Sequence, residues 1–323
     1  MQIEKRFTLP KIGMYLVLFV MLVFTLMPIL FMISASMMTS RQILKMPYTW
    51  IPEGIAWENF AKAIQGNDKT YIFVRNITNS LIVSTAVAIS TVLIASLTGY
   101  GLAKFRFRGR NTVFMMIMAT MMIPFEAIMI PLYMVVMTLR IQNSYIGLIL
   151  PFLVSAFGVF QMKQFLTTFP TEFLDAARVD GMGEFGIYWR IVLPNCKPVI
   201  ATLAILSFRS QWDNLLWPLL VSQSDKMKTI PQYISSFALE RSTDEGAMMA
   251  AALLASIPMF ILFMSLTKYF IGGAGPHVSG QGCGFKARIL PIFFFVFFLK
   301  LYGSSKREMV FLVRVPTVYN KVN

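Results

Sequence analysis

Six long apolar runs constrain this sequence more than any other feature. Each approaches the roughly 20 consecutive apolar residues that an α-helix needs to cross the hydrocarbon core of a bilayer. Because lipid offers no hydrogen-bond partners, the backbone of such runs must pair within a helix. The sequence therefore predicts an all-α, polytopic membrane protein with six transmembrane helices, expected at residues 12–34, 77–98, 113–136, 144–160, 198–221 and 247–271.

The composition excludes a soluble enzyme. Hydrophobic residues make up 56% and charged residues 14% of the 323 residues, against about 45–50% and about 25% in soluble proteins. A zinc site is disfavoured, because His277 is the only histidine and no Cys-x-x-Cys occurs. A disulfide between Cys196 and Cys283 is not expected, since Cys196 should face the cytoplasm, where thiols stay reduced. No catalytic, cofactor-binding or metal-binding residue is predicted in this chain.

The basic residues predict the orientation of the spans. Lys104, Arg106, Arg108 and Arg110 crowd one short loop that holds no acid, which marks this loop as cytoplasmic. Both termini are then expected in the cytoplasm. The first apolar run is too long for a signal-peptide core and is expected to be retained. A nucleic-acid-binding patch is the competing interpretation of the basic loop, disfavoured between two closely spaced spans.

Three charged residues lie away from the ends of the predicted spans: Glu126, Arg209 and Asp213. Arg209 and Asp213 are four residues apart, so they share a helix face and can neutralise each other. They are expected either to form a structural ion pair or to line an aqueous pathway. Pro124 and Pro131 flank Glu126, and a helix break there would bring Glu126 near the outer interface.

The predicted inner segment 162–197 has the pattern of a helix, a turn and a second helix. Thr171 is positioned to cap the first helix, and Asp175 places negative charge near its N-terminus. Gly181 can adopt the left-handed conformation that ends a helix. An amphipathic stretch follows and is expected to stop at Pro194. A plain pair of interfacial helices is the simplest interpretation.

The same segment resembles the EAA loop of ABC importer permeases, whose spacing is E-A-A-x3-G-x9-I-x-L-P. The chain departs from it by an aspartate in place of the glutamate. The matching residues are Asp175, Ala176, Ala177, Gly181, Ile191, Leu193 and Pro194. Further likeness to the carbohydrate-uptake branch, of the MalG or multiple-sugar type, lies at residues 79–81, 99–103, 107–110, 122–124, 131–133, 184–185, 189–190, 212–214, 216–218 and 269–270. The resemblance implies the type I permease (MetI-like) fold.

The resemblance also implies a mechanism. The loop at 171–194 would form a coupling helix that docks in a cleft on a cytoplasmic ATPase subunit. Asp175 would meet a basic group of that subunit, Ala176 and Ala177 would fit the cleft, and Gly181 would shape the turn. Closure of two such ATPases would drive alternating access. ATP and magnesium would be bound by these partners, since this chain has no G-x-x-x-x-G-K-[ST].

Two more partners follow from the resemblance: a second, homologous permease subunit and an extracytoplasmic solute-binding protein, working at a bacterial cytoplasmic membrane. The outer loop 222–246 would face the binding protein and carries Lys226, Lys228, Glu240 and Asp244.

The expected solute is a sugar or oligosaccharide. Aromatic faces and hydrogen-bonding side chains suit sugars, so the candidate pathway residues are Arg209, Trp212, Asp213, Asn214 and Trp217. Packing at an interface is their alternative role. Glycerol phosphate is an alternative solute within the same branch. An ion-coupled carrier or an intramembrane enzyme is disfavoured, because three intramembrane charges do not make a polar cluster at the midplane.

The expected organisation has three parts: a first transmembrane helix with an external loop (1–75), a permease domain (76–275) and an atypical tail (276–323). The tail holds an 11-residue apolar run at 289–299, which is too short to span a bilayer. Its basic flank is typical of an interfacial segment. Out-of-frame sequence after a frameshift is the other interpretation of this tail.

Overall fold

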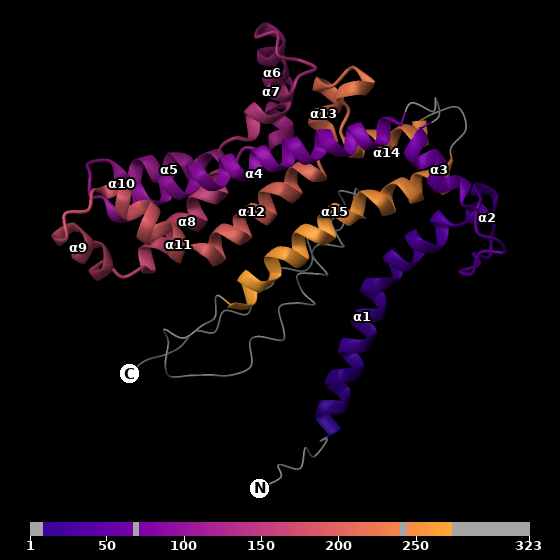
Figure 1. The fold of residues 1–323 in the computed structure, drawn as a ribbon, viewed down its shortest axis with the longest axis horizontal. Coiled ribbons are helices and arrows are strands. Elements are labelled where there is room, and N and C mark those ends of the chain that lie inside the picture. The colour runs from indigo at the N-terminus through magenta and orange to yellow at the C-terminus, as the bar shows by residue number, and fades with distance from the viewer. Residues whose placement is uncertain (1–8, 67–70, 240–243, 273–323) are drawn as a thin grey trace. The chain divides into compact units, whose positions relative to one another are not determined.

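A computed structural model describes residues 9–66, 71–239 and 244–272 of this chain. Every regular element in these ranges is helical, which confirms the all-α prediction (Figure 1). Met32–His277 form one compact unit, and the first helix up to Phe31 belongs to a second. Residues 32–75, which the sequence grouped with the first helix, therefore lie in the same unit as the permease helices. The tail at 276–323 lies outside the described residues.

The helices follow one another along the chain with short connections. Their bounds are α1 Leu9–Ser36, α2 Ser40–Leu44, α3 Glu58–Gln65, α4 Ile72–Lys104, α5 Arg110–Thr120, α6 Phe125–Thr138, α7 Tyr145–Ile149, η1 Leu150–Phe152, α8 Ala156–Thr168, α9 Glu172–Val179, α10 Glu184–Ile187, η2 Tyr188–Val192, α11 Leu193–Asn195, α12 Lys197–Trp212, α13 Leu216–Val221, η3 Asp225–Met227, α14 Ile230–Leu239 and α15 Glu245–Gly272.

Within the described residues, three helices are long and apolar enough to cross a membrane, namely α1, α4 and α15. Three bent helix pairs bring the number of candidate spans to as many as six: α5 with α6 at 93°, α7–η1 with α8 at 44°, and α10–α11 with α12 at 80°. This agrees with the six predicted spans. Pro124 is the N-cap of α6, and Glu126 lies in its first turn, so the third span breaks where the prolines predicted a break.

The centre of the larger unit is α4, which packs along α8 and α12 (Figure 1). Their shared core is built from fully buried apolar side chains, among them Leu166, Leu174, Ile187 and Leu203. Leu174 and Ile187 come from the inner segment, so this segment is packed onto the bundle by the same core that joins the spans.

Two boundaries predicted from the sequence are wrong. The helix of the second span does not end at residue 98, because α4 continues to Lys104. The fifth span is not one helix, because α12 and α13 are separated around Asn214. The Asn214 amide donates to the Gln211 side chain and its oxygen accepts from the Trp217 backbone N–H, each at 3.3 Å. Such side-chain bonds to the backbone compete with helical pairing.

Gly99 serves close packing and does not end the helix. A Cβ built at Gly99 would lie 2.6 Å from the Cβ of Met162 on α8 and 3.0 Å from the backbone nitrogen of Lys163. Any side chain there would push α8 away from α4, because well-packed helices have no space to absorb a new methyl group.

We expect Gly99→Ala to destabilise the protein by about 1–3 kcal/mol, measured as a lower Tm in detergent. Gly101→Ala is the matched control. Gly101 lies in the same helix, and a Cβ there meets no atom within 4 Å. Equal Tm values for the two variants would contradict the close approach of α4 and α8.

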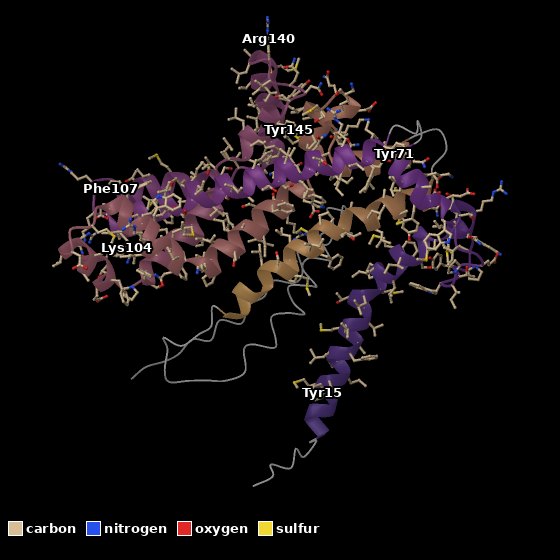
Figure 2. All side chains as sticks on the ribbon, in the orientation of Figure 1. Tyr15, Tyr71, Lys104, Phe107, Arg140 and Tyr145 are labelled. Carbon is tan, nitrogen blue, oxygen red and sulfur yellow. The ribbon has the colours of Figure 1, made fainter. Side chains whose placement is uncertain are left out.

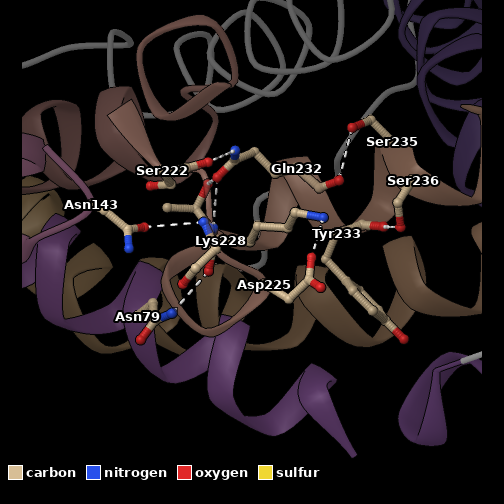
Figure 3. A network of polar contacts seen from close by, with 11 residues as sticks. Asn79, Asn143, Ser222, Asp225, Lys228, Gln232, Tyr233, Ser235 and Ser236 are labelled. Carbon is tan, nitrogen blue, oxygen red and sulfur yellow. Dashed lines mark hydrogen bonds and ion pairs between the residues drawn. The ribbon is translucent and has the colours of Figure 1, made fainter. Parts of the chain in front are cut away.

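Near the N-terminal end of α4, the loop after α13 is tied to this helix by side-chain amides. Asn79 donates to the carbonyl oxygens of Lys226 and Lys228 at 3.0 and 2.9 Å, and Asn143 accepts from the backbone N–H of Ser224 at 3.1 Å. Figure 3 shows Asn79, Asn143 and Lys228 in this network, with Lys228 paired to Asp225. The loop is thus held in one conformation by residues from α4 and from the turn before α7.

Of the four charged residues expected in the outer loop, Lys226 is exposed and Lys228 is half-buried, while Glu240 lies outside the described residues. Asp244 joins α3 to the start of α15. Its carboxylate accepts from the Lys62 Nζ at 2.9 Å and from the Ala247 backbone N–H at 3.1 Å.

Asp244 gives this junction a pH dependence. Burial acts to raise the pKa of its carboxyl, but Lys62, the Ala247 amide and the Ser40 hydroxyl together hold the pKa below its ordinary value. A depressed folded pKa means that the carboxylate stabilises the fold above its unfolded pKa of about 3.9. This contribution is lost as the pH falls through the lowered value.

We therefore expect Asp244→Asn to lower the stability at neutral pH by about 1 kcal/mol or less, since Lys62 is half exposed and its charge is screened by solvent. The Tm difference from wild type should shrink as the pH is lowered towards about 3. Glu58→Gln, an exposed carboxylate at the start of α3, is the control. A difference that does not change with pH would count against the ion pair.

Candidate functional site

The inner segment forms a short helix that ends in a tight glycine turn. Thr171 is the N-cap of α9, but its side chain does not cap the helix, so that detail of the prediction is wrong. Its carbonyl accepts from the Leu174 and Asp175 amides at 2.9 Å. Gly181 has a φ of +79°, as predicted. The Met182 N–H donates to the Ala177 carbonyl and the Gly181 N–H to the Arg178 carbonyl, both at 3.0 Å, which is the Schellman pattern of helix termination.

Arg178 links the two helices across this turn. Its Nη1 donates to Asp175 Oδ1 and its Nε to Glu184 Oε1, each at 2.7 Å. The guanidinium fork thus uses two different nitrogens to hold one carboxylate from α9 and one from α10. Glu184, followed by Asp175, raises the pKa of Arg178 above its ordinary value, so the guanidinium stays charged.

The linked helices are fixed to the C-terminal end of α4. The Tyr100 hydroxyl donates to Glu184 Oε2 at 2.8 Å, and the hydroxyls of Ser96 and Tyr188 lie 2.6 Å apart. Lys104 donates to the Phe169 carbonyl, just before α9, at 2.6 Å. Figure 2 places Lys104 at the end of α4 where α9 and α10 lie in Figure 1. A force on α9 is thereby transmitted to the longest helix of the described chain.

The α9 segment has one buried face, formed by Leu174 and Ala177 in the core of the chain itself. Three large apolar side chains of α9 and α10 are nevertheless open to solvent beside the charged residues, with exposed fractions of 60% for Phe173, 88% for Val179 and 67% for Phe185. Ala176 is also exposed. We call Phe173, Ala176, Val179 and Phe185 the α9 surface.

The remaining residues of the motif also include both buried and exposed positions. Ile191 and Leu193 are partly buried and pack against the core beneath α9, while Pro194 is exposed. The helix passes Pro194 and ends at Asn195. Of the two alanines expected in a partner's cleft, the structure leaves Ala176 accessible and encloses Ala177.

The candidate pathway residues are not brought together on one surface. Arg209 and Asp213 form an ion pair, with Arg209 Nε 3.2 Å from Asp213 Oδ2, which confirms their predicted mutual neutralisation. Trp212 is buried and stacks on Phe208. Trp217 is completely buried, and its Nε1 donates to the Gly147 carbonyl at 3.0 Å. In this conformation neither tryptophan presents a ring to a solute, so both act in packing.

Sequence reasoning missed the charge network of Arg178, Glu184 and Tyr100. Arg178 occupies an unspecified position of the motif, and the sequence placed Glu184 in the amphipathic stretch without a partner. Tyr100 is 84 residues from Glu184, and no local spacing relates the two. The single arginine among four acids in residues 172–184 was the available signal.

No group of three or more His, Cys, Asp and Glu side chains that could hold a metal ion occurs within residues 9–66, 71–239 and 244–272. The charged cluster on α9 and α10 is therefore described as an ion-pair network.

Comparisons with known proteins agree with the fold and identify a family. Residues 91–273 match the family described as "Binding-protein-dependent transport system inner membrane component". The arabinooligosaccharides transport system permease protein AraQ of Bacillus subtilis is 33% identical, with 83% of this chain and 95% of AraQ covered. The lactose transport system permease protein LacG of Rhizobium radiobacter is 35% identical, with 83% of this chain and 96% of LacG covered.

Two further matches widen the comparison. The sn-glycerol-3-phosphate transport system permease protein UgpE of Brucella abortus is 34% identical, covering 84% of this chain and 98% of UgpE. A crystal structure of a bacterial ABC transporter involved in the import of the acidic polysaccharide alginate has a chain that superposes with a TM-score of 0.68 at 21% identity. The superposition covers 84% of this chain and 99% of the transporter chain, so the two chains share a fold.

Proposed function

The chain belongs to the family of binding-protein-dependent transport system inner membrane components, and from this premise we propose that it is the translocation subunit of an ATP-driven sugar importer. It lies in the bacterial cytoplasmic membrane with both termini in the cytoplasm. The observation that carries the coupling role is the α9 surface, an exposed apolar patch held rigidly to α4 through Arg178, Glu184 and Tyr100.

The α9 surface supports docking to a separate ATPase subunit. An exposed phenylalanine and a valine with 88% of its surface accessible are unusual beside a turn rich in charges, and such patches mark interaction sites. The short helix inserts in the partner's cleft with Ala176 facing it. Asp175 lies at the rim and can exchange its internal partner Arg178 for a basic group of the ATPase.

The complete transporter contains a second permease, two ATPases and an extracytoplasmic binding protein. ATP and magnesium are bound by the ATPases, and this chain performs no chemistry. The outer loop after α13, held by Asn79 and Asn143, faces the binding protein. The translocation route has at its outer end, where α12 ends, the residues Arg209, Asp213 and Asn214.

A sugar is favoured as the solute by two of the relatives, whose names give arabinooligosaccharides and lactose. Glycerol phosphate is the second candidate, because UgpE is named for sn-glycerol-3-phosphate transport at similar identity. The two solutes differ in charge, and a direct uptake assay separates them.

The test is uptake by the complex, purified with its genomically adjacent partners and reconstituted in liposomes that contain ATP. We expect uptake of a radiolabelled arabino-oligosaccharide or of lactose that requires the binding protein. If sn-glycerol-3-phosphate is taken up and neither sugar is, glycerol phosphate is the solute and the assignment to sugars is wrong. Uptake that does not require ATP would contradict an ATP-driven importer.

A further inference from the structure

An open cavity of about 350 Å³ lies where the basic loop after α4 runs into α5. Two arginines line it, together with side chains that offer an amide and a hydroxyl. The full lining is Arg106, Phe107, Gly109, Arg110, Asn111 and Thr112. Phe107 lies at the same end of the unit as Lys104 (Figure 2). The loop whose charges orient the spans therefore also forms a hollow that is lined by hydrogen-bond donors.

The positive charge of this loop is not neutralised by the described residues. Arg106 and Arg108 form no side-chain hydrogen bond or ion pair within the part of the chain that the structure describes. In the same part of the chain, the Arg110 guanidinium donates only to the Phe105 carbonyl, with its Nη1 at 3.5 Å. Three guanidinium groups within five residues thus keep most of their donors available.

The neighbouring helices supply no acid to this loop. No aspartate or glutamate occurs in residues 99–120 or in α8, the helix that packs against α5. Instead, α8 contributes Lys163, whose Nζ lies 3.3 Å from the centre of the Phe114 ring and within electrostatic reach of Arg110. Cations gathered in this way repel one another, and a bound anion would relieve the repulsion.

Exposed apolar side chains continue from the cavity along α5. Met115 and Met116 follow Thr112 by three and four residues, so they lie on the same side of the helix as this lining residue. Their exposed fractions are 67% and 58%. Phe105 and Phe107, which alternate with the arginines of the loop, are exposed as well. Basic and aromatic residues at the end of a span are typical of the membrane–water interface.

The arginines and the apolar strip together match an amphiphilic anion. The planar guanidinium binds phosphate oxygens through two parallel N–H donors, and basic pockets on the cytoplasmic side of spans are suited to anionic lipid headgroups. A phospholipid fills both parts, with its phosphate in the cavity and its acyl chains against α5. A soluble phosphate would use the cavity alone and leave the apolar strip uncovered.

We propose that this cavity, the α5 cavity, binds the phosphate group of an anionic phospholipid whose acyl chains lie along Met115 and Met116. The choice of the cytoplasmic leaflet rests on the orientation given in the proposed function, while the binding itself does not depend on transport.

The test measures binding of radiolabelled dioleoylphosphatidylglycerol to the purified complex, immobilised in detergent for a scintillation proximity assay. Unlabelled phosphatidylglycerol should displace the label, and dioleoylphosphatidylcholine should displace it only at much higher concentration. Each basic side chain near an anionic headgroup contributes about fivefold in affinity. We therefore expect Arg106→Gln and Arg110→Gln each to raise the Kd about fivefold, and the double variant about 25-fold.

Arg190→Gln is the matched control. It removes the same charge from an exposed position in the segment after α9 and lies outside the cavity lining, so its Kd should equal that of wild type. Equal displacement by the two lipids would overturn the proposal. So would cavity variants that bind like wild type, or a loss in Arg190→Gln as large as theirs, because binding would then follow net charge and not the cavity.

A competition with inorganic phosphate distinguishes the two sources of the anion. Millimolar phosphate should leave the labelled lipid bound, because it cannot replace the contacts of the acyl chains with α5. Displacement of the lipid by millimolar phosphate would overturn the assignment to a phospholipid and make the cavity a site for soluble phosphate. The assay contains no ATP, sugar or binding protein, so a failure of the proposed sugar import would not change its result.

Discussion

Replacing Arg178 by alanine should uncouple the transporter while leaving its helices folded. The side chain joins α9 to α10 through two ion pairs of 2.7 Å, and α9 has only eight residues, too few to hold its orientation alone. Partly exposed pairs contribute roughly 0.2–1 kcal/mol each. Losing both shifts the population of correctly oriented α9, and with it the stimulated ATPase rate, by up to about thirtyfold.

Arg178→Lys should retain an intermediate rate, because one ammonium cannot reproduce the fork that reaches both carboxylates. Arg190→Ala, an exposed arginine of the same segment, is the matched control. The measurement is binding-protein-stimulated ATP hydrolysis together with the Tm of the complex. A wild-type rate of ATP hydrolysis in Arg178→Ala would contradict a positioning role for Arg178. A drop in the Tm of the complex large enough to account for the lost activity by unfolding would contradict it as well.

Phe173→Asp should release the ATPase from the permease. Phe173 is 60% exposed in this chain, so the substitution leaves the core of the permease intact. If the ring is buried in the partner's cleft, an unpaired carboxylate there costs about 3 kcal/mol, or roughly a hundredfold in affinity. Co-purification of the ATPase with the permease, followed by blotting, measures this loss.

Two matched variants make this result specific. Phe173→Leu keeps an apolar side chain and should retain the ATPase, and Thr167→Asp adds the same charge at an exposed position of α8 and should retain it as well. Retention of the ATPase by Phe173→Asp would show that the α9 surface is not the docking site.

The helical class and the membrane spans could be predicted because lipid acts on length and hydropathy, which are local properties of the chain. Gly181 could be predicted for a similar reason, since a left-handed turn after a short helix is decided by the residue at that point. Gly99 could not, because the need for glycine comes from Met162 on another helix.

Tertiary contacts also decide how the candidate site residues are placed. Whether Ala176 or Ala177 faces a partner depends on which side of α9 packs on Leu174 and Ile187, and the motif alone does not determine that side. Trp217 carries an aromatic face suited to sugars, yet the Gly147 carbonyl satisfies its N–H inside the subunit.

The most direct test of the central claim is ATP hydrolysis by the purified complex, with and without its binding protein and sugar, in wild type and in Gly181→Asp. Gly181 has a positive φ and no neighbour within 4 Å of an added Cβ, so a side chain there strains the α9 turn without disturbing the core. We predict stimulation in wild type and its loss in the variant. Equal stimulation in both proteins would contradict coupling through α9.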